Sequence, residues 1–241
     1  MAGKKRSSSS SVQDWEKAKK IVAENADALK ALESHGQIYK WAKDNGVDTG
    51  ALFKRFKVEL HKQLDIDYDA MRDEANALRR EQIAAAAVDG PLLEVFTAAD
   101  GQGSFAVCAP DGSIVSYGAF HPDNTVFKQD DQLSADRAAA DHAVFLAGKA
   151  REDLDVEAAR LRLHVLNHEV DADDPVLVRS ALISRVDVTI EVDDTNPADE
   201  WTQEAGYKSW RETNLNILLV DEGAEDAAAE GDEADDASLV G

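Results

Sequence analysis

Four basic side chains fall within nine residues of this chain, at Lys54, Arg55, Lys57 and Lys62. Ammonium and guanidinium groups are the side chains that bind phosphate oxygens, and several of them on one helix can follow a nucleic-acid backbone. The segment that carries them also has helical spacing and aromatic neighbours. It therefore predicts a surface that contacts DNA or RNA, with an ordinary solvated helix face as the alternative.

The cysteine and histidine residues do not predict a disulfide or a zinc site. Cys108 is the single cysteine, which excludes an intrachain disulfide and any cysteine-based zinc site, and its apolar surroundings predict a core residue. His164 and His168 have a spacing that binds metal on a helix, but we expect them on a strand and its exit loop. We therefore expect no zinc there.

Charge is distributed unevenly along the 241 residues. Residues 1–90 contain 16 Lys and Arg against 15 Asp and Glu, whereas residues 91–241 contain 10 against 33. A surface this acidic repels polyanions unless salt screens it or it faces away from them. Residues 221–241 hold much of this charge and no cation, so we expect a disordered acidic tail.

The N-terminal part is expected to be helical. Residues 1–11 are basic and then serine-rich, which predicts a disordered tail, and helices are expected over 12–32, 37–45, 51–63 and 68–88. Segment 37–63 resembles a helix-turn-helix, with Gly46 at the turn and apolar positions on either side. The alternative is a plain helical hairpin. The break at Asp89-Gly90-Pro91 predicts the domain boundary.

A different pattern follows that boundary, over residues 91–220. Short apolar runs at 92–97, 104–109, 114–120, 161–166 and 186–192 predict strands. Helical periodicity at 134–150, 174–184 and 198–210 predicts three helices. The fold class is therefore α/β (α+β), with three antiparallel strands followed by crossover helices and two further strands. Segment 215–220 is expected to be an extra strand or a docking segment.

The order of these elements resembles the ribonuclease H fold over about residues 92–210. Three stretches support the resemblance: Leu93-Glu94-Val95-Phe96-Thr97 with Ser104-Phe105-Ala106-Val107, then Ala140-Asp141-His142-Ala143, and finally Asn196-Pro197-Ala198-Asp199. The last is similar to the segment that opens the family's final helix. The resemblance implies a mixed five-stranded sheet in which the fourth strand is parallel to the first.

The resemblance also implies a site for two Mg²⁺ ions, which cleaves phosphodiesters and needs convergent carboxylates. Ala98 stands where the family has its first-strand Asp, with Asp100 two residues later. Asn167 stands where the family has its fourth-strand Asp, with Glu169 two residues later. Asp141 corresponds best to the helix Glu, and Asp199 matches the last position directly. The implied catalytic set is Asp100, Asp141, Glu169 and Asp199, with Asp141 and Asp199 as metal ligands, but it is degenerate.

These observations support three hypotheses. The first is a nucleic-acid-associated protein with weak or lost nuclease activity, the second is an active Mg²⁺-dependent nuclease, and the third is an interaction or assembly protein of a mobile element. No apolar run reaches the roughly 18 residues that a membrane span needs. Residues 1–11 lack the apolar stretch of a secretory signal. We therefore expect a cytoplasmic protein without a membrane partner.

Overall fold

The computed structural model describes residues 8–220, with side chains from residue 12 onward, and these residues form two compact units that divide between Leu78 and Arg79. The division lies inside a helix, about three turns before the expected boundary at Asp89-Gly90-Pro91. That breaker does end the helix, at Ala87. The predicted acidic tail at 221–241 lies outside the described residues, as do residues 1–7.

The helical unit contains α1 (Ser8–Glu24), α2 (Ala26–Lys30), α3 (His35–Asp44), α4 (Gly50–Leu64) and the first half of α5 (Tyr68–Ala87). Ser8–Ser11, which we expected in a disordered tail, begin α1. The single helix expected over 12–32 is broken at Asn25, whose backbone and side-chain N–H groups both donate to the Ile21 carbonyl. Side chains from all five helices form its core, with Val22, Leu29, Ile38, Phe56 and Tyr68 among them.

The turn between α3 and α4 is closed by its backbone. Gly46 has a φ of +66°, a left-handed conformation that suits glycine at the end of a helix. The Val47 N–H donates to the Ala42 carbonyl at 2.8 Å, and the Val47 side chain is fully buried. A left-handed residue followed by a buried apolar residue turns the chain sharply. This geometry agrees with the predicted helix-turn-helix as it does with a plain hairpin.

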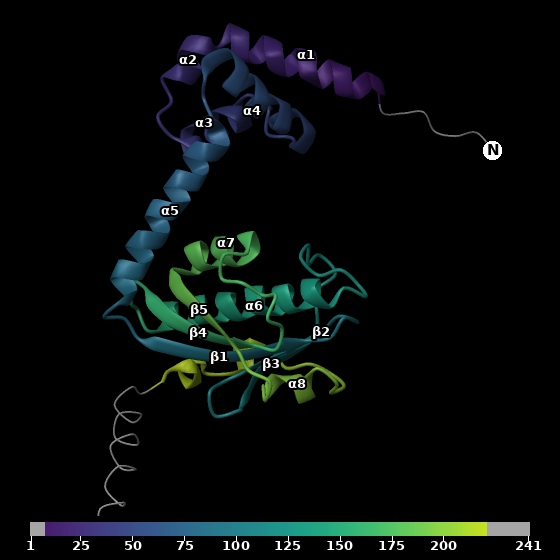
Figure 1. Ribbon diagram of the computed structural model, residues 1–241, viewed down its shortest axis with the longest axis vertical. Helices are drawn as coiled ribbons and strands as arrows, with labels where there is room; N and C mark the ends of the chain where they lie inside the picture. Colours follow the sequence, from purple (N-terminus) through teal and green to yellow (C-terminus); the bar gives the residue numbers. More distant parts are fainter. Residues whose placement is uncertain (1–7, 221–241) are drawn as a thin grey trace, which may run out of the picture. The chain divides into compact units, whose positions relative to one another are not determined.

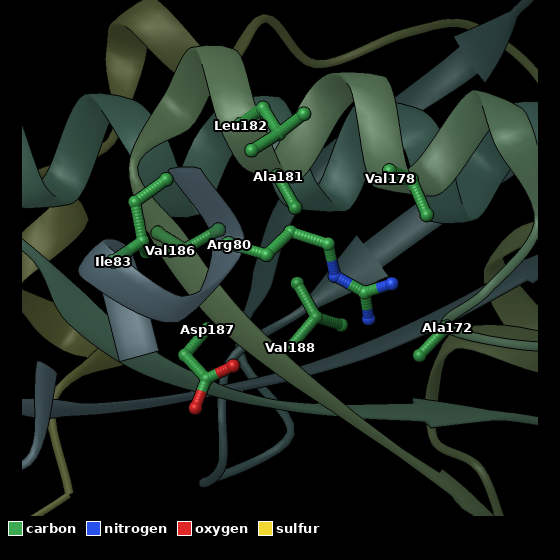
Figure 2. A pocket seen from close by; sticks show the side chains of 9 residues that line it. All are labelled: Arg80, Ile83, Ala172, Val178, Ala181, Leu182, Val186, Asp187 and Val188. Atoms are coloured by element: carbon green, nitrogen blue, oxygen red, sulfur yellow. The ribbon is translucent and has the colours of Figure 1, made fainter. Parts of the chain in front are cut away.

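The second half of α5 belongs to the sheet unit. Ile83 and Ala87 are buried there against Ala158 and Leu182. Figure 2 shows the Arg80 side chain extending between the helix and the strand that carry Leu182 and Val188. Its guanidinium lies 2.7 Å from the Asp173 carboxylate. The cavity beside Arg80 has a volume of only about 20 Å³. These side chains therefore pack the second half of α5 against α7 (Pro175–Ser184) and β5 (Val186–Val192), and they leave no room for a ligand.

The sheet unit is built on a mixed five-stranded sheet of β1 (Leu92–Ala99), β2 (Ser104–Cys108), β3 (Ile114–Ala119), β4 (Ala159–Val165) and β5 (Val186–Val192). The strand order is β3-β2-β1-β4-β5. β1 pairs antiparallel with β2 and parallel with β4, and β4 pairs parallel with β5. This confirms the expected fold class and pairing, and it is compatible with the order and orientation that the ribonuclease H resemblance implies.

Two helices cover one face of the sheet, α6 (Gln132–Asp153) and α7 (Pro175–Ser184) (Figure 1). Alanines on α6 let it approach closely, and the core beneath it contains Leu93, Val95, Leu161 and Leu163. Gly148 permits the contact between the helices, since a Cβ there would lie 2.6 Å from the Ser184 Cβ. α6 connects β3 to β4, and α7 connects β4 to β5. Because these three strands run in the same direction, the two connecting helices run parallel to each other.

The chain after β5 departs from its predicted helix. We expected 198–210 to be helical, but α8 spans only Ala198–Trp201. The chain instead turns at Gly206, whose φ is +106°, so that Lys208 can form an antiparallel bridge with Tyr117. Two short 3₁₀ turns follow, η1 (Trp210–Glu212) and η2 (Leu215–Leu218), and Leu219 then bridges Leu93. Among the described helices, none is long and apolar enough to cross a membrane.

Candidate functional site

The ends of β1 and β4 lie side by side, and three polar side chains meet there, Gln132, Asp136 and Asn167. Asp136 is 7% exposed and lies about one turn after the first residue of α6. Asn167 Nδ2 donates to Asp136 Oδ2 at 2.9 Å, and Gln132 Nε2 donates to Asp136 Oδ1 at 2.9 Å. We call these three residues the amide–carboxylate cluster.

The backbone fixes both amides of the cluster. Asn167 Oδ1 accepts the N–H of Glu169 at 2.9 Å, so its Nδ2 faces Asp136. Gln132 Nε2 also donates to the carbonyl of Ala99, the last residue of β1, at 2.8 Å. Two amide donors therefore occupy both oxygens of Asp136. Burial raises the pKa of Asp136 above its usual value, and the bonds from Asn167 and Gln132 offset part of that rise.

Asp136 is not among the site residues predicted from the sequence, which include Asp141, five residues further along the same helix. Five residues turn a helix by roughly 140°, so the two side chains leave it on different sides. Asp141 is half-buried beside α7, where Ser180 Oγ lies 3.5 Å from its backbone carbonyl. Burial raises the pKa of Asp141 as well. The sequence feature that marks Asp136 as buried is its position among Ala135, Ala138 and Ala139, on the apolar face of the helix.

The other three predicted carboxylates have separate surroundings. Asp100 Oδ1 accepts the N–H groups of Gln102, Gly103 and Ser104 and so shapes the turn between β1 and β2. Glu169 is exposed on the loop after β4, and Asp199 is exposed on α8, on the sheet face opposite α6 (Figure 1). No group of three or more His, Cys, Asp or Glu side chains within residues 12–220 has a metal-binding arrangement.

Asn196, which opens the same sequence stretch as Asp199, forms hydrogen bonds that hold the fold together. Asn196 is 5% exposed, and its Nδ2 donates to the carbonyls of Thr97 and His164 at 3.1 and 3.2 Å. Its Oδ1 accepts the Ala198 N–H at 2.9 Å. Asn196 thus ties the start of α8 to the ends of β1 and β4. Ala98 is buried on the α8 side of the sheet, among Ala106, Cys108 and Ala198, and supplies no ligand.

The residues considered for nucleophilic or zinc chemistry, Cys108, His164 and His168, lie in separate surroundings. Cys108 is fully buried, and burial raises the pKa of its thiol to about 12, so the reactive thiolate is suppressed. His164 Nε2 lies 2.7 Å from Glu94 Oε1, and the ring stacks on Phe96. His168 is exposed on the loop after β4.

The four basic residues of α4 fall into two kinds. Arg55 pairs with Asp14 of α1, and Lys57 Nζ lies 2.6 Å from Asp69 Oδ2 of α5. Lys54 is exposed and forms no ion pair in the described chain. Lys62 is also exposed, and its Nζ lies 4.0 Å from Glu59 Oε1 and 5.4 Å from the centroid of the Trp15 ring. Two of the predicted phosphate contacts therefore hold the helical unit together, and Lys54 and Lys62 are the more accessible pair.

Comparison with known proteins adds no family. A scan against protein-family models finds no match, and a search among curated proteins finds none either.

Proposed function

We propose that this chain is a nucleic-acid-associated protein whose sheet unit is a ribonuclease H-like domain with weak or lost nuclease activity. The order and direction of its five strands are compatible with that fold. The observation that carries the loss of activity is the amide–carboxylate cluster. It stands at the joined ends of β1 and β4, where the resemblance implies the metal ligands.

The residues at this position do not fit a pair of Mg²⁺ ions. Each Mg²⁺ is commonly held by one or two carboxylates together with waters and substrate phosphates, so a pair of ions needs several convergent carboxylates. Asn167 offers an N–H₂ group toward Asp136 instead of a carboxylate, and Gln132 offers a second. Ala98 has only a methyl group. Each Asp136 oxygen already accepts one amide N–H, so a metal ion would compete with these two donors for the carboxylate.

The nucleic-acid role rests on the helical unit. Its α4 residues Lys54 and Lys62 are exposed and can reach phosphates, Lys62 in competition with Glu59. Arg55 and Lys57 instead pair with acidic side chains of α1 and α5. The unit is near neutral overall, unlike the acidic sheet unit, so it offers the weaker repulsion to a polyanion.

Cleavage is tested first. A labelled RNA–DNA hybrid, duplex DNA and single strands are incubated with the full chain and Mg²⁺ or Mn²⁺, at low and molar salt. We expect little or no product. Robust cleavage that Asp199→Asn or Asp136→Asn abolishes would establish the alternative, an active Mg²⁺-dependent nuclease.

Binding is tested separately, by fluorescence anisotropy with labelled DNA and RNA across a salt titration. Lys54→Glu with Lys62→Glu should weaken binding and lower the salt slope by about 0.7 to 0.9 for each lost phosphate contact. Lys149→Glu in the sheet unit makes the same charge change per residue and serves as control. Wild-type binding that neither substitution alters would exclude α4 as the contact surface, and no binding at all would favour the assembly hypothesis.

A further inference from the structure

A groove of about 760 Å³ lies on the outer side of the sheet unit, between α6, α7 and the loop at 124–131. Ligand pockets for small molecules commonly have volumes of about 300–1,000 Å³. The groove follows the two parallel helices. Arg137 pairs with Asp174 at one end, Asp141 faces Ser180 in the middle, and Phe145 and Ile183 line the other end. We call it the α6–α7 groove, and none of the amide–carboxylate cluster lines it.

Cations gather at this groove although the unit is acidic. Residues 91–220 contain 10 Lys and Arg against 24 Asp and Glu, and three of those ten line the groove: Lys128, Arg137 and Arg179. Lys128 and Arg179 form no ion pair within the described chain, although the charge of Arg179 lowers the pKa of Asp141. Arg137 Nε lies 2.8 Å from Asp174 Oδ2.

The acids of the groove are largely committed to other tasks. Asp131 Oδ1 accepts the Ser134 N–H and caps α6, while Asp174 Oδ1 accepts the Val176 N–H and caps α7. Asp141 remains, and burial raises its pKa while Ser180 and the charge of Arg179 offset part of that rise. The caps leave Asp131 and Asp174 negatively charged, so the groove places three cations, from three separate elements, beside three carboxylates.

The other end of the groove is apolar and exposed. The Phe145 side chain is 38% exposed and that of Ile183 is 68% exposed. Trp210 holds the Phe145 ring edge-on, with centroids 5.8 Å apart. His142 stacks on the same ring, with centroids 6.0 Å apart, and Lys149 Nζ lies 5.7 Å from its centroid. A flat heterocycle that stacks on Phe145 would therefore compete with the Lys149 ammonium.

We propose that the α6–α7 groove binds a small organic phosphate with a flat ring, of the nucleoside diphosphate class. The phosphates would lie between Lys128, Arg137 and Arg179, and the ring against Phe145. The acidic surface around the groove disfavours a long polyanion more than a small one, because every further phosphate adds repulsion. The proposal does not depend on the nucleic-acid role of α4.

Isothermal titration calorimetry of the full chain tests this, with ADP, inorganic pyrophosphate and adenosine as probes. We expect saturable ADP binding with a Kd below about 1 mM, weaker pyrophosphate binding and still weaker adenosine binding. Arg179→Gln should weaken ADP and pyrophosphate about tenfold, the loss expected for one charge-assisted contact. Phe145→Ala should weaken ADP and leave pyrophosphate unchanged. Asp141→Asn should tighten both, since it removes a negative charge.

Arg72→Gln, in the helical unit, removes one positive charge elsewhere and should change nothing. Circular dichroism checks that each variant folds, and Lys128→Gln replaces Arg179→Gln if the latter does not. Two results would overturn the proposal: no saturable binding of ADP or pyrophosphate, or ADP binding that Arg179→Gln and Lys128→Gln leave intact. A 12-nucleotide RNA that binds more tightly than ADP and loses affinity in Arg179→Gln would instead make the groove a nucleic-acid contact.

Discussion

Asn167 donates its side-chain N–H to Asp136 across 2.9 Å, so an amide stands against the buried carboxylate at the ends of β1 and β4. A carboxylate in place of Asn167 would face Asp136 with like charge and without a donor. A cation between them would turn that repulsion into coordination.

Asn167→Asp should make the stability of the chain depend on divalent metal. Without metal, the lost hydrogen bond and the new repulsion should cost roughly 1–3 kcal/mol of unfolding free energy. Mg²⁺ or Mn²⁺ should restore part of it, because a bound ion stabilises the folded state. Thermal melts in EDTA and in 10 mM Mg²⁺ measure this, with Gln129→Glu as a matched surface control. Equal metal responses in both variants would show that no site is formed.

Substitutions of the adjacent α4 residues Arg55 and Lys54 should lower the free energy of unfolding by different amounts. Arg55→Gln removes the partner of Asp14 and should cost about 1–2 kcal/mol, between the values for exposed and for buried ion pairs. Lys54→Gln should cost less than about 0.5 kcal/mol. Urea unfolding of both variants checks the difference. Equal losses would mean that the pairing between α1 and α4 contributes nothing.

Two glycine-to-alanine substitutions should act in opposite directions. At Gly148 the new methyl would lie 2.6 Å from Ser184 Cβ and force α6 and α7 apart, at a cost of about 1–3 kcal/mol. At Gly36 in α3 the nearest atom is 4.0 Å away, so Gly36→Ala should gain up to about 1 kcal/mol from helix propensity. Denaturant midpoints of the two variants report the sign, and a neutral Gly148→Ala would contradict the tight packing of α6 on α7.

Asp141→Asn should become more stable relative to the wild type as pH rises. Burial raises the folded-state pKa of Asp141 above its unfolded value of 3.8, so the folded chain binds more protons just above that pH. Wild-type stability from this group is therefore lost as pH rises through the folded pKa. The asparagine does not ionise, so the difference should be smallest near pH 3 and largest above the folded pKa. Unfolding free energies from pH 3 to 7 test this, and a difference that does not vary with pH would refute it.

The sequence by itself determined the elements and their class. The alternation of apolar and polar residues predicted β5 at 186–192 with the bounds it has in the structure, and the three leading strands and α7 were also found closely. Strand and helix periodicities are local, so they can be read from neighbouring residues. The last helix was predicted too long because the Lys208–Tyr117 bridge, which draws the chain away, joins residues far apart in the sequence.

Only the tertiary structure decided which residues of each element meet. Asp136 and Asp141 stand on one helix, and the way α6 lies on the sheet sets Asp136 against Asn167, 31 residues away. Arg55 and Lys54 are adjacent, yet Arg55 alone reaches Asp14, 41 residues earlier. The α6–α7 groove likewise needs a loop and two helices at once. Such contacts depend on how elements pack, and packing joins residues that no local pattern connects.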